Sequence, residues 1–397
     1  MSPGGQDLPA LRREVSAWLV REGLNGSDIS GLLHGFAERL TAGGVRLSRA
    51  YLAMATISPD FRAVNVTWRR GREALRESVG HDRFPGAFEA SPLHFLITNN
   101  IPRRRWRIGR EGGTSGYGLL EELRAEGDTD YIAEVVRFGS SADFAVEGIA
   151  LTACSDEPDG FTDAEVALMS ELTQPLALAA YRIALFDIAV DVLGAYLGHD
   201  AGLRVLNGQI RRGEGQSVDA ALMVADLSGF TAAAETGAEA LVARLGEHLS
   251  AMVTPIEAVG GEVLKFLGDG ILAGFPIDEA SGDGACAAAL DAACRAITMN
   301  DAVNERHPED QLPLKIGLHR GKVFYGNVGA GTRLDFTVIG PAVNEASRLE
   351  ALCGTLGHRL LMSRSFAQSC GREIVGLGLH KLRGVTEPRE IFTLPGF

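Results

Sequence analysis

The sequence has no run of about 18 uninterrupted apolar residues, so no segment has the form of a membrane-spanning helix. Its first five residues lack the basic and then apolar pattern of a signal peptide. The five cysteines are odd in number, scattered and free of CxxC spacing, which argues against a disulfide framework or a cysteine zinc site. We therefore expect a soluble cytoplasmic protein with reduced, buried thiols.

A surplus of basic residues is also lacking. The chain has 38 Lys and Arg against 51 Asp and Glu, a formal net charge of -13, whereas a nucleic-acid surface needs clustered positive charge. The nearest thing to a basic patch is 103–107, and because charge runs are usually exposed we expect a solvated loop there. No nucleic-acid partner is expected.

Length and hydrophobicity predict two domains. The 397 residues are well over the ~150 typical of one domain, and 46% hydrophobic residues can fill two cores. We expect an N-terminal helical segment over 1–44, an α+β domain over 45–175, a helical linker over 176–215 and a second α+β domain over 216–397.

Helices and strands are both indicated in the N-terminal half. Apolar residues at helical spacing predict a helix over 11–24, and period-two alternation predicts a strand over 63–68. Two apolar runs within 131–154 predict a hairpin joined through 139–143. Thr162 and Glu165 form a capping box, so a helix is predicted to begin near residue 163.

These elements resemble a GAF-type sensor domain over roughly residues 45–185, mainly through the last fifty of them. Ligands of such domains vary, so the resemblance implies a sensor of an unknown small molecule or signal. His81, His94 and Trp106 could line a pocket, but side chains of these types more often belong to ordinary packing or to the surface.

The exit helix carries a candidate dimer seam. Apolar residues recur at alternating spacings of three and four: Leu178, Tyr181, Leu185, Ile188, Val192 and Ala195. This seam could pair in parallel with its copy from a second chain, or the helix could pack on its own domain. The segment 198–202 breaks the pattern, and the polar segment 211–215 is the expected joint between the domains.

Two carboxylates follow strand-like runs in the C-terminal half. The run 221–225 ends at Asp226, and strands over 262–266 and 271–275 form a glycine-linked hairpin with Asp269 at its tip. Paired carboxylates beside tight glycine turns suggest metal-bound phosphate.

The order β-α-β-β-α-β in this half predicts a ferredoxin-like or palm-type α+β sheet. Thr236 and Glu239 form a capping box for its first helix. The remaining expected elements are a helix over 282–299, strands over 314–318, 321–328 and 335–339, and a helix over 342–353 opened by Pro341 at its N1 position.

Four motifs in this domain resemble the successive signatures of class III nucleotidyl cyclases. They lie at 226–231, 265–270, 317–321 and 336–350, and the resemblance covers about 218–397. Any one of them is a weak signal, whereas four in the right order are specific. The resemblance implies an adenylate or guanylate cyclase, in which a ribose 3'-hydroxyl attacks the α-phosphorus and pyrophosphate leaves.

Through this resemblance, Asp226 and Asp269 are the ligands of two Mg²⁺ or Mn²⁺ ions, and Leu227 belongs to the same metal site. Hard cations prefer carboxylate oxygens, and two of them can activate the attacking oxygen and neutralise the triphosphate. The turn that continues through Phe230 and Thr231 would offer backbone N–H groups to the β- and γ-phosphates. The alternative, that both aspartates are only turn and cap residues, stays open.

The resemblance also implies that Asn344 orients the ribose and that Arg348 stabilises charge on the reacting phosphate. Four residues apart on a helix, they share a face; a salt bridge of Arg348 with Glu345 or Glu350 is the structural alternative. Arg383 stands where the family has a triphosphate-binding lysine. Arginine keeps the charge, and Lys381 could substitute for it.

Lys265 and Thr337 occupy the base-selecting positions of the family. An ammonium group can donate to an adenine ring nitrogen but not to the N1–H of guanine, so Lys265 favours ATP over GTP. Thr337 stands where many adenylate cyclases have aspartate, and its hydroxyl can accept from the adenine amino group. The pair resembles the lysine/threonine subgroup of bicarbonate-responsive adenylate cyclases, which makes bicarbonate sensitivity a hypothesis.

The family architecture implies a head-to-tail homodimer with two equivalent sites. The metal ligands of one chain would face the base-, ribose- and phosphate-binding residues of the other. We expect an adenylate cyclase regulated by its N-terminal domain. The alternatives are a GTP-preferring enzyme and a catalytically silent nucleotide-binding regulator.

Overall fold

The computed structural model describes residues 7–26, 28–56, 61–80, 88–139, 148–230, 238–277, 284–331 and 333–397, without the side chains of 238–243. The chain divides into two compact units, Met1–Val192 and Leu193–Phe397. This division falls inside the segment 176–215, for which the sequence predicts a linker. None of the helices in the described ranges is both long and apolar enough to cross a membrane.

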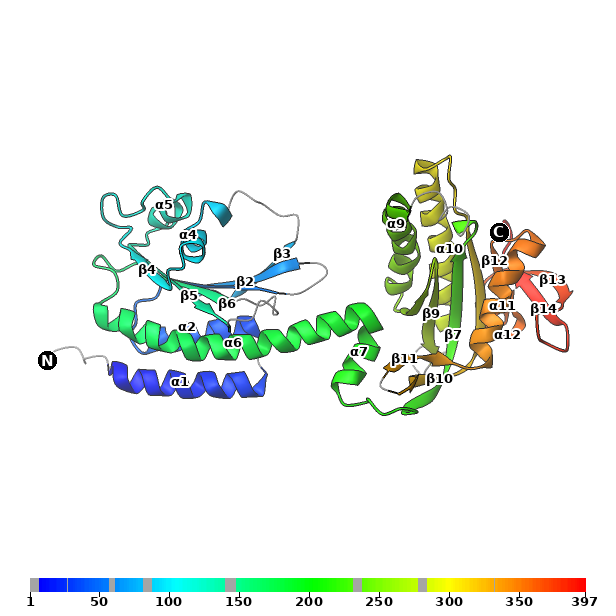
Figure 1. The fold of residues 1–397 in the computed structure, drawn as a ribbon, viewed down its shortest axis with the longest axis horizontal. Helices are drawn as coiled ribbons and strands as arrows, with labels where there is room; N and C mark the ends of the chain where they lie inside the picture. Colours follow the sequence, from blue (N-terminus) through cyan, green and yellow to red (C-terminus); the bar gives the residue numbers. More distant parts are fainter. Residues whose placement is uncertain are drawn as a thin grey trace. The chain divides into compact units, whose positions relative to one another are not determined.

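A six-stranded antiparallel sheet forms the centre of the first unit (Figure 1). Its strands are β1 (Arg49–Ala55), β2 (Phe61–Arg69), β3 (Leu75–Gly80), β4 (Arg103–Trp106), β5 (Asp130–Arg137) and β6 (Gly148–Ser155). They lie in the order β3-β2-β1-β6-β5-β4. The strand predicted over 63–68 is therefore confirmed within β2, and β5 and β6 form the predicted antiparallel pair, although residues 140–147 between them lie outside the described ranges.

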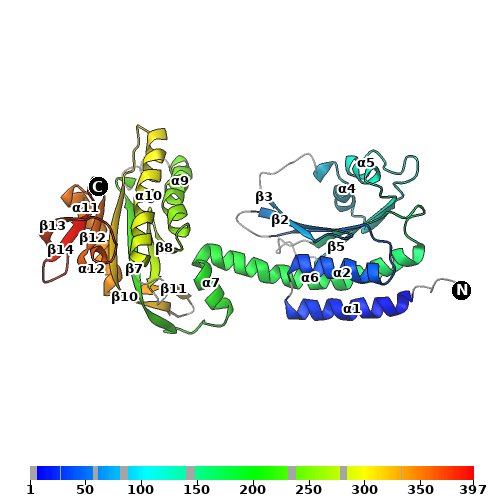
Figure 2. The same cartoon turned by 180° about the vertical axis from the view of Figure 1, so that it is seen from behind.

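Helices cover both faces of this sheet (Figure 2). On one face lie α1 (Leu8–Asn25), α2 (Ile29–Ala42) and α6 (Asp163–Leu197); on the other lie α4 (Pro92–Thr98) and α5 (Gly118–Ala125). Because side chains alternate along a strand, Leu52 and Val66 pack toward the first helix layer while Tyr131 and Cys154 pack toward the second. The helix predicted over 11–24 is confirmed as α1.

The predicted capping box at the start of α6 is confirmed. The backbone N–H of Glu165 donates to Oγ1 of Thr162 at 3.2 Å, and the backbone N–H of Thr162 donates to Oε2 of Glu165 at 2.8 Å. Both contacts satisfy N–H groups that a helix start leaves without intrahelical acceptors.

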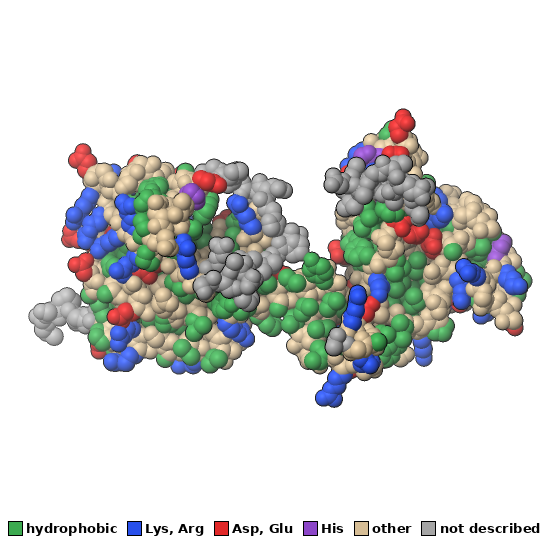
Figure 3. Space-filling model, in the orientation of Figure 1, with side chains coloured by type: hydrophobic (Ala, Val, Ile, Leu, Met, Phe, Trp, Pro, Cys, Tyr) green, Lys and Arg blue, Asp and Glu red, His purple; other side chains and the backbone are tan. Residues whose placement is uncertain are grey.

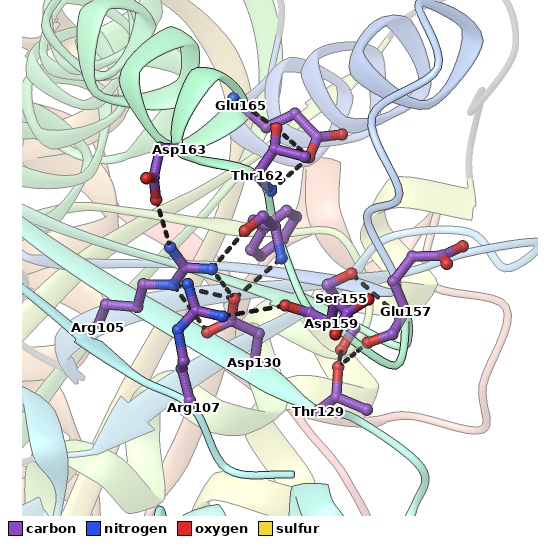
Figure 4. Close-up of polar contacts among 11 residues, drawn as sticks. Arg105, Arg107, Thr129, Asp130, Ser155, Glu157, Asp159, Thr162, Asp163 and Glu165 are labelled. Atoms are coloured by element: carbon purple, nitrogen blue, oxygen red, sulfur yellow. Dashed lines mark hydrogen bonds and ion pairs between the residues drawn. The ribbon is translucent and has the colours of Figure 1, made fainter. Parts of the chain in front are cut away.

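The basic run at 103–107 is not the solvated loop that we expected, because residues 103–106 form the edge strand β4. Basic side chains gather over β4 and α5 in Figure 3. Arg105 nevertheless turns inward: its Nη2 lies 2.6 Å from Oδ2 of Asp130, whose side chain is fully buried, and its Nη1 lies 3.4 Å from Oδ1 of Asp163 (Figure 4). Arg105 thereby ties β4 and β5 to the first turn of α6.

Half of the candidate dimer seam on α6 is packed against the first unit, and the other half is exposed. Tyr181, Ile188 and Val192 pack into the core of the first unit, whereas Leu178 and Leu185 are 67% and 38% exposed. Hydrophobic side chains gather along the C-terminal part of this helix in Figure 3. Packing on its own unit therefore uses half of the seam and leaves the other half on the surface.

A larger sheet organises the second unit. Its strands are β7 (Gly215–Leu227), β8 (Glu262–Leu267), β9 (Gly270–Ile277), β10 (Leu314–Ala330), β11 (Arg333–Ile339), β12 (Leu360–Ser363), β13 (Val375–His380) and β14 (Arg389–Thr393). The sheet runs β13-β14-β12-β10-β7-β9-β8, and β11 pairs with β10. Its core of β10, β7, β9 and β8 has the ferredoxin-like 4-1-3-2 order, so the palm-type α+β prediction is confirmed.

The helices of this unit are α7 (His199–Leu206), α9 (Ala238–Glu257), α10 (Gly284–Arg306), α11 (Pro341–Leu356) and α12 (Arg364–Ala367). One sheet face packs against α9 and α10, and the other against α7, α11 and the β10–β11 hairpin (Figure 1). Pro341 is at the predicted helix start. Thr236 of the second predicted capping box lies outside the described residues, as does the side chain of Glu239.

The prediction of separate strands over 314–318 and 321–328 is wrong. Both belong to the single 17-residue strand β10, which pairs with β7 without interruption from Leu314 opposite Leu227 to Gly326 opposite Gly215. The glycine at 321, which suggested a break, stays within the ladder because β7 satisfies its neighbours on both sides.

Candidate active site

Asp226 and Asp269 lie at neighbouring ends of the strands β7 and β9, on the margin of the larger sheet where strands end. The pairing of Ala225 on β7 with Ile271 on β9 sets Asp226 beside Gly270, the residue that follows Asp269. A Cβ atom at Gly270 would lie only 2.6 Å from Oδ1 of Asp226 and 2.5 Å from the carbonyl oxygen of Ala225. Glycine is therefore required at 270 for the Asp226 carboxylate to occupy its position.

The electrostatics of this edge favour a cation. Burial, reinforced by the charge of Asp269 and opposed by Lys315, raises the pKa of Asp226 to about 6. Burial and the charge of Asp226 raise the pKa of Glu350, on α11, to about 7, and Lys315 again opposes the shift. A single lysine faces three carboxyl groups, so negative charge is undercompensated where the sequence predicts metal.

The donor set fits magnesium or manganese. Within the described ranges, no three His, Cys, Asp or Glu side chains are grouped closely enough to hold one ion, which leaves the paired carboxylates of Asp226 and Asp269 as the acidic donors. Their hard oxygen atoms are the ligands that Mg²⁺ and Mn²⁺ prefer. Glu350 contributes charge to this edge, a role that sequence reasoning missed.

The turn after β7 is described only in part. Leu227 is buried, and the backbone N–H of Ser228 donates to the carbonyl of Pro313 at 2.8 Å. Phe230 packs its ring against the core of the second unit, so only its backbone is placed for the predicted phosphate contact. Thr231 lies outside the described residues.

A close helix–strand contact positions the residues predicted to bind ribose and phosphate. A Cβ atom at Gly317 on β10 would lie 2.4 Å from both the Ala346 carbonyl oxygen and the Glu350 nitrogen on α11, so the helix backbone rests directly on the strand. Asn344 is exposed on this helix and Arg348 is half-buried. The predicted alternative pair is not seen: Glu345 lies 3.9 Å from Nδ1 of His319, and neither Glu345 nor Glu350 forms a salt bridge with Arg348 in the described structure.

Arg348 lies beside the C-terminal basic segment. Its Nη2 is 3.5 Å from the position that a Cβ atom would take at Gly384. Leu382 is buried in a small core with Leu349 of α11, and the flanking Lys381 and Arg383 are exposed. The structure therefore places the segment that carries Lys381 and Arg383 next to Arg348.

Lys265 lies next to the strand that carries Thr337. Its Nζ forms an ion pair with Oδ2 of Asp335, which is two residues before Thr337 on β11 and hence on the same strand face. Thr337 is 8% exposed. Asp335 was not predicted from the sequence, because its role depends on how the β10–β11 hairpin folds back toward β8.

Residues 214–375 match the family model of the adenylate and guanylate cyclase catalytic domain. The second unit thus contains a class III nucleotidyl cyclase catalytic domain, as the fold and the four motifs indicate.

The chain is also similar to several proteins that are named as adenylate cyclases. An adenylate cyclase of Anabaena cylindrica is 34% identical over 152 residues, which are 37% of this chain and 30% of that protein. Adenylate cyclase 2 of Rhizobium meliloti (strain 1021) is 27% identical over 257 residues, 63% of this chain and 68% of that protein. The crystal structure of the adenylyl cyclase CyaB from P. aeruginosa aligns with 45% of this chain and 94% of its own, at 28% identity and a TM-score of 0.41. The chain spans less than a third of the Anabaena protein.

Proposed function

We propose that the protein is an adenylate cyclase that converts ATP to 3',5'-cyclic AMP and pyrophosphate. The observation that carries this proposal is the contact of the Asp226 carboxylate with Gly270, which sets two acidic side chains side by side at the edge of a palm-type sheet. Two relatives named adenylate cyclases support the choice of ATP.

Asp226 and Asp269 would hold two Mg²⁺ or Mn²⁺ ions, with the Leu227 backbone at the same site. When bound, such ions neutralise the triphosphate and lower the pKa of the attacking hydroxyl. The chain's own contribution is to hold these carboxylates at a fixed sheet edge and to surround the phosphates with Arg348, Arg383 and Lys381. Arginine suits this role because its planar group binds two phosphate oxygens at once.

The adenine base would be selected by Lys265 and Thr337. The ammonium group of Lys265 has three donors, so it can keep its ion pair with Asp335 and still donate to a ring nitrogen of adenine. The hydroxyl of Thr337 would accept a hydrogen bond from the adenine amino group. Guanine presents an N1–H donor where adenine presents a ring-nitrogen acceptor, so it would leave the Lys265 ammonium group without that partner.

The complete site would form in a head-to-tail homodimer. Asn344 would orient the ribose and Arg348 would stabilise the reacting phosphate from the chain opposite to the one that supplies the metal ligands. The exposed half of the α6 seam, which includes Leu178 and Leu185, supports pairing of α6 with its copy from the second chain.

The first unit would act as a GAF-like sensor over residues 45–175, preceded by the helical segment 1–44 and connected through 176–215 to a catalytic domain over 216–397. Its antiparallel sheet, layered between α1, α2 and α6 on one face and α4 and α5 on the other, supports this proposal. In this arrangement the sensor regulates how two catalytic domains meet.

The test is a cyclase assay of the full-length protein with ATP or GTP and Mn²⁺, in which cAMP and cGMP are quantified separately. We expect cAMP as the main product and its loss in Asp269→Asn. A higher rate with GTP would support a guanylate cyclase, and absence of both products, with nucleotide binding retained, would support a silent regulator. The same assay on residues 193–397 shows whether the first unit activates or restrains catalysis.

A further inference from the structure

The first unit has an open cavity of about 960 Å³ on the sheet face that α4 and α5 only partly cover. Its lining comes from β1, β2, β3, β5 and β6, with side chains of α4 and α5 closing one side. A volume in this range is typical of sites for small molecules. His94 and Trp106 do not line it, which agrees with the expectation of ordinary packing or a surface position, and His81 lies outside the described residues. Trp106 packs edge-on against Tyr117 and Tyr131.

Small residues at the centre of the sheet create this space. Ala53 on β1 lies between Ala150 on β6 and Asn65 on β2, and Ala55 pairs with Ala63 one row further along. The opposite face of the same strands carries large side chains and is filled. A leucine at any of these alanine positions would project into the cavity and fill part of it. The alanines therefore keep the cavity open.

One end of the cavity is polar and positively charged. Nη1 of Arg49 lies 3.5 Å from Oγ1 of Thr152, and the Arg49 guanidinium lies 5.2 Å from the centre of the Tyr51 ring. Among the described residues, no carboxylate lies within salt-bridge distance of Arg49, although many other arginines of this unit are paired. A half-buried guanidinium without an acidic partner is suited to an anion from outside the chain.

A second observation at the same end also points to a ligand. The side chain of Tyr131 is fully buried and lines the cavity, yet its hydroxyl makes no hydrogen bond of normal geometry within the described structure, and the Thr152 side chain is its polar neighbour. A buried hydroxyl without a hydrogen bond destabilises the folded protein. An acceptor oxygen bound beside Arg49 would relieve this cost.

The rest of the cavity is mainly apolar. Its walls include Phe88, Leu93, Ile97 and Leu119. The lining also contains Arg62, Arg137 and Glu77; the guanidinium of Arg137 is engaged with the carbonyl of Ile97 at 2.8 Å, and Arg62 has a partner of its own. Positive charge therefore exceeds negative charge in the lining. Arg49 forms no salt bridge within the described residues, although its charge acts at longer range on the buried carboxylate of Asp128.

We propose that this cavity binds a small amphipathic carboxylic acid. Its carboxylate accepts hydrogen bonds from Arg49, from the hydroxyl of Tyr131 and from that of Thr152, and its apolar body lies on the alanine floor. This site supplies a ligand class for the first unit, and it depends only on the geometry of that unit, whatever the second unit catalyses.

Binding is measured by isothermal titration calorimetry of the full-length protein with octanoate, and with 1-octanol as a neutral probe of the same length. We expect saturable binding of octanoate, at least tenfold weaker binding of octanol, and at least tenfold weaker binding of octanoate to Arg49→Gln. Arg72→Gln removes an equal charge from an exposed turn outside the cavity and serves as the control with unchanged affinity.

A second variant tests the floor independently of charge. Ala53→Leu fills the centre of the cavity with apolar volume, so it is expected to abolish octanoate binding while the first unit melts at the same temperature or higher. All three tryptophans, Trp18, Trp68 and Trp106, belong to the first unit, so tryptophan fluorescence follows its unfolding alone. Equal affinities for octanoate and octanol, unchanged octanoate binding in Ala53→Leu, or no saturable octanoate binding would each overturn the proposal.

Discussion

Lys265 on β8 forms an ion pair with Asp335, two residues before Thr337 on β11. Both side chains are almost half exposed, so the pair adds little to stability. The pair matters because it holds the Lys265 ammonium group beside β11, the strand that carries Thr337, the second of the two residues proposed to select the base.

Asp335→Asn is expected to raise the KM for ATP about fivefold and to leave kcat almost unchanged, because a pair of this exposure contributes at most ~1 kcal/mol. The rate ratio of ATP to GTP should fall in parallel. Steady-state kinetics with both nucleotides measure this. Glu309→Gln removes an exposed charge without a charged partner in the described structure and should behave as wild type; an unchanged KM in Asp335→Asn would remove Asp335 from base recognition.

Asp226→Ala and Arg348→Ala, each inactive alone, should regain activity when mixed and allowed to exchange subunits. In a random mixture half of the dimers are mixed, and each has one intact site of two, so about a quarter of wild-type activity is expected. Cyclic AMP production is measured after exchange has been verified with differently tagged chains. Arg348→Ala mixed with itself is the control, and a verified heterodimer without activity would contradict the shared site.

Bicarbonate is expected to raise the rate at fixed pH when it replaces chloride at equal ionic strength. The Lys265 and Thr337 pair motivates this expectation, and Thr337→Asp should lower the response while cyclase activity remains. A rate that is the same in both salts would sink the hypothesis. Initial rates measured across a bicarbonate series at one buffered pH are sufficient.

Glu350 should make the second unit less stable as pH rises. Its pKa in the folded protein, about 7, is above the ordinary value of 4.5. Between pH 4.5 and pH 7 the folded protein therefore holds a proton on Glu350 that the unfolded chain releases. The stability that depends on this proton is lost as the pH rises through that range. In metal-free protein, Glu350→Gln should recover on the order of 1 kcal/mol at pH 8 relative to pH 5, because solvent screens a partly exposed group.

Differential scanning calorimetry at pH 5 and pH 8 measures this effect on the unfolding of the second unit. That transition is identified as the one that tryptophan fluorescence does not report, because the tryptophans all belong to the first unit. Glu309→Gln is the matched control and should keep the wild-type pH dependence. An identical pH dependence in Glu350→Gln would show that the carboxyl group titrates normally in the folded protein.

Arg105→Ala should destabilise the first unit by about 3–5 kcal/mol, because it leaves the fully buried carboxylate of Asp130 without its cation. Arg103→Ala removes a neighbouring, half-exposed arginine of the same strand whose contact with Glu134 is longer, at 3.5 Å, and it should cost less than Arg105→Ala. Urea unfolding followed by tryptophan fluorescence measures both. Equal effects of the two substitutions would mean that the buried pair has no special role.

The sequence allowed the palm-type core to be predicted because its motifs combine local signals with a fixed order. The Asp226 and Asp269 motifs carry glycine turns, and Pro341 marks a helix start, so each could be recognised without tertiary information. The ion pair of Lys265 with Asp335 and the charge of Glu350 could not, since they join residues from separate elements.

The two errors have related causes. Gly321 suggested a strand break, but continuous pairing of β10 with β7 overrode that local preference. The arginine-rich run suggested a solvated loop, but Arg105 finds a buried partner 25 residues away. The cavity has no motif at all, because it depends on which small residues become neighbours when strands pair.

At Gly317 the backbone of α11 lies so close to β10 that even a methyl group would not fit between them. The helix cannot roll about its own axis without separating from the strand, so Asn344 and Arg348 keep the orientation that the sheet gives them. In the proposed cyclase, a regulatory signal would therefore act by moving the second unit as a whole and not by rotating α11 within it.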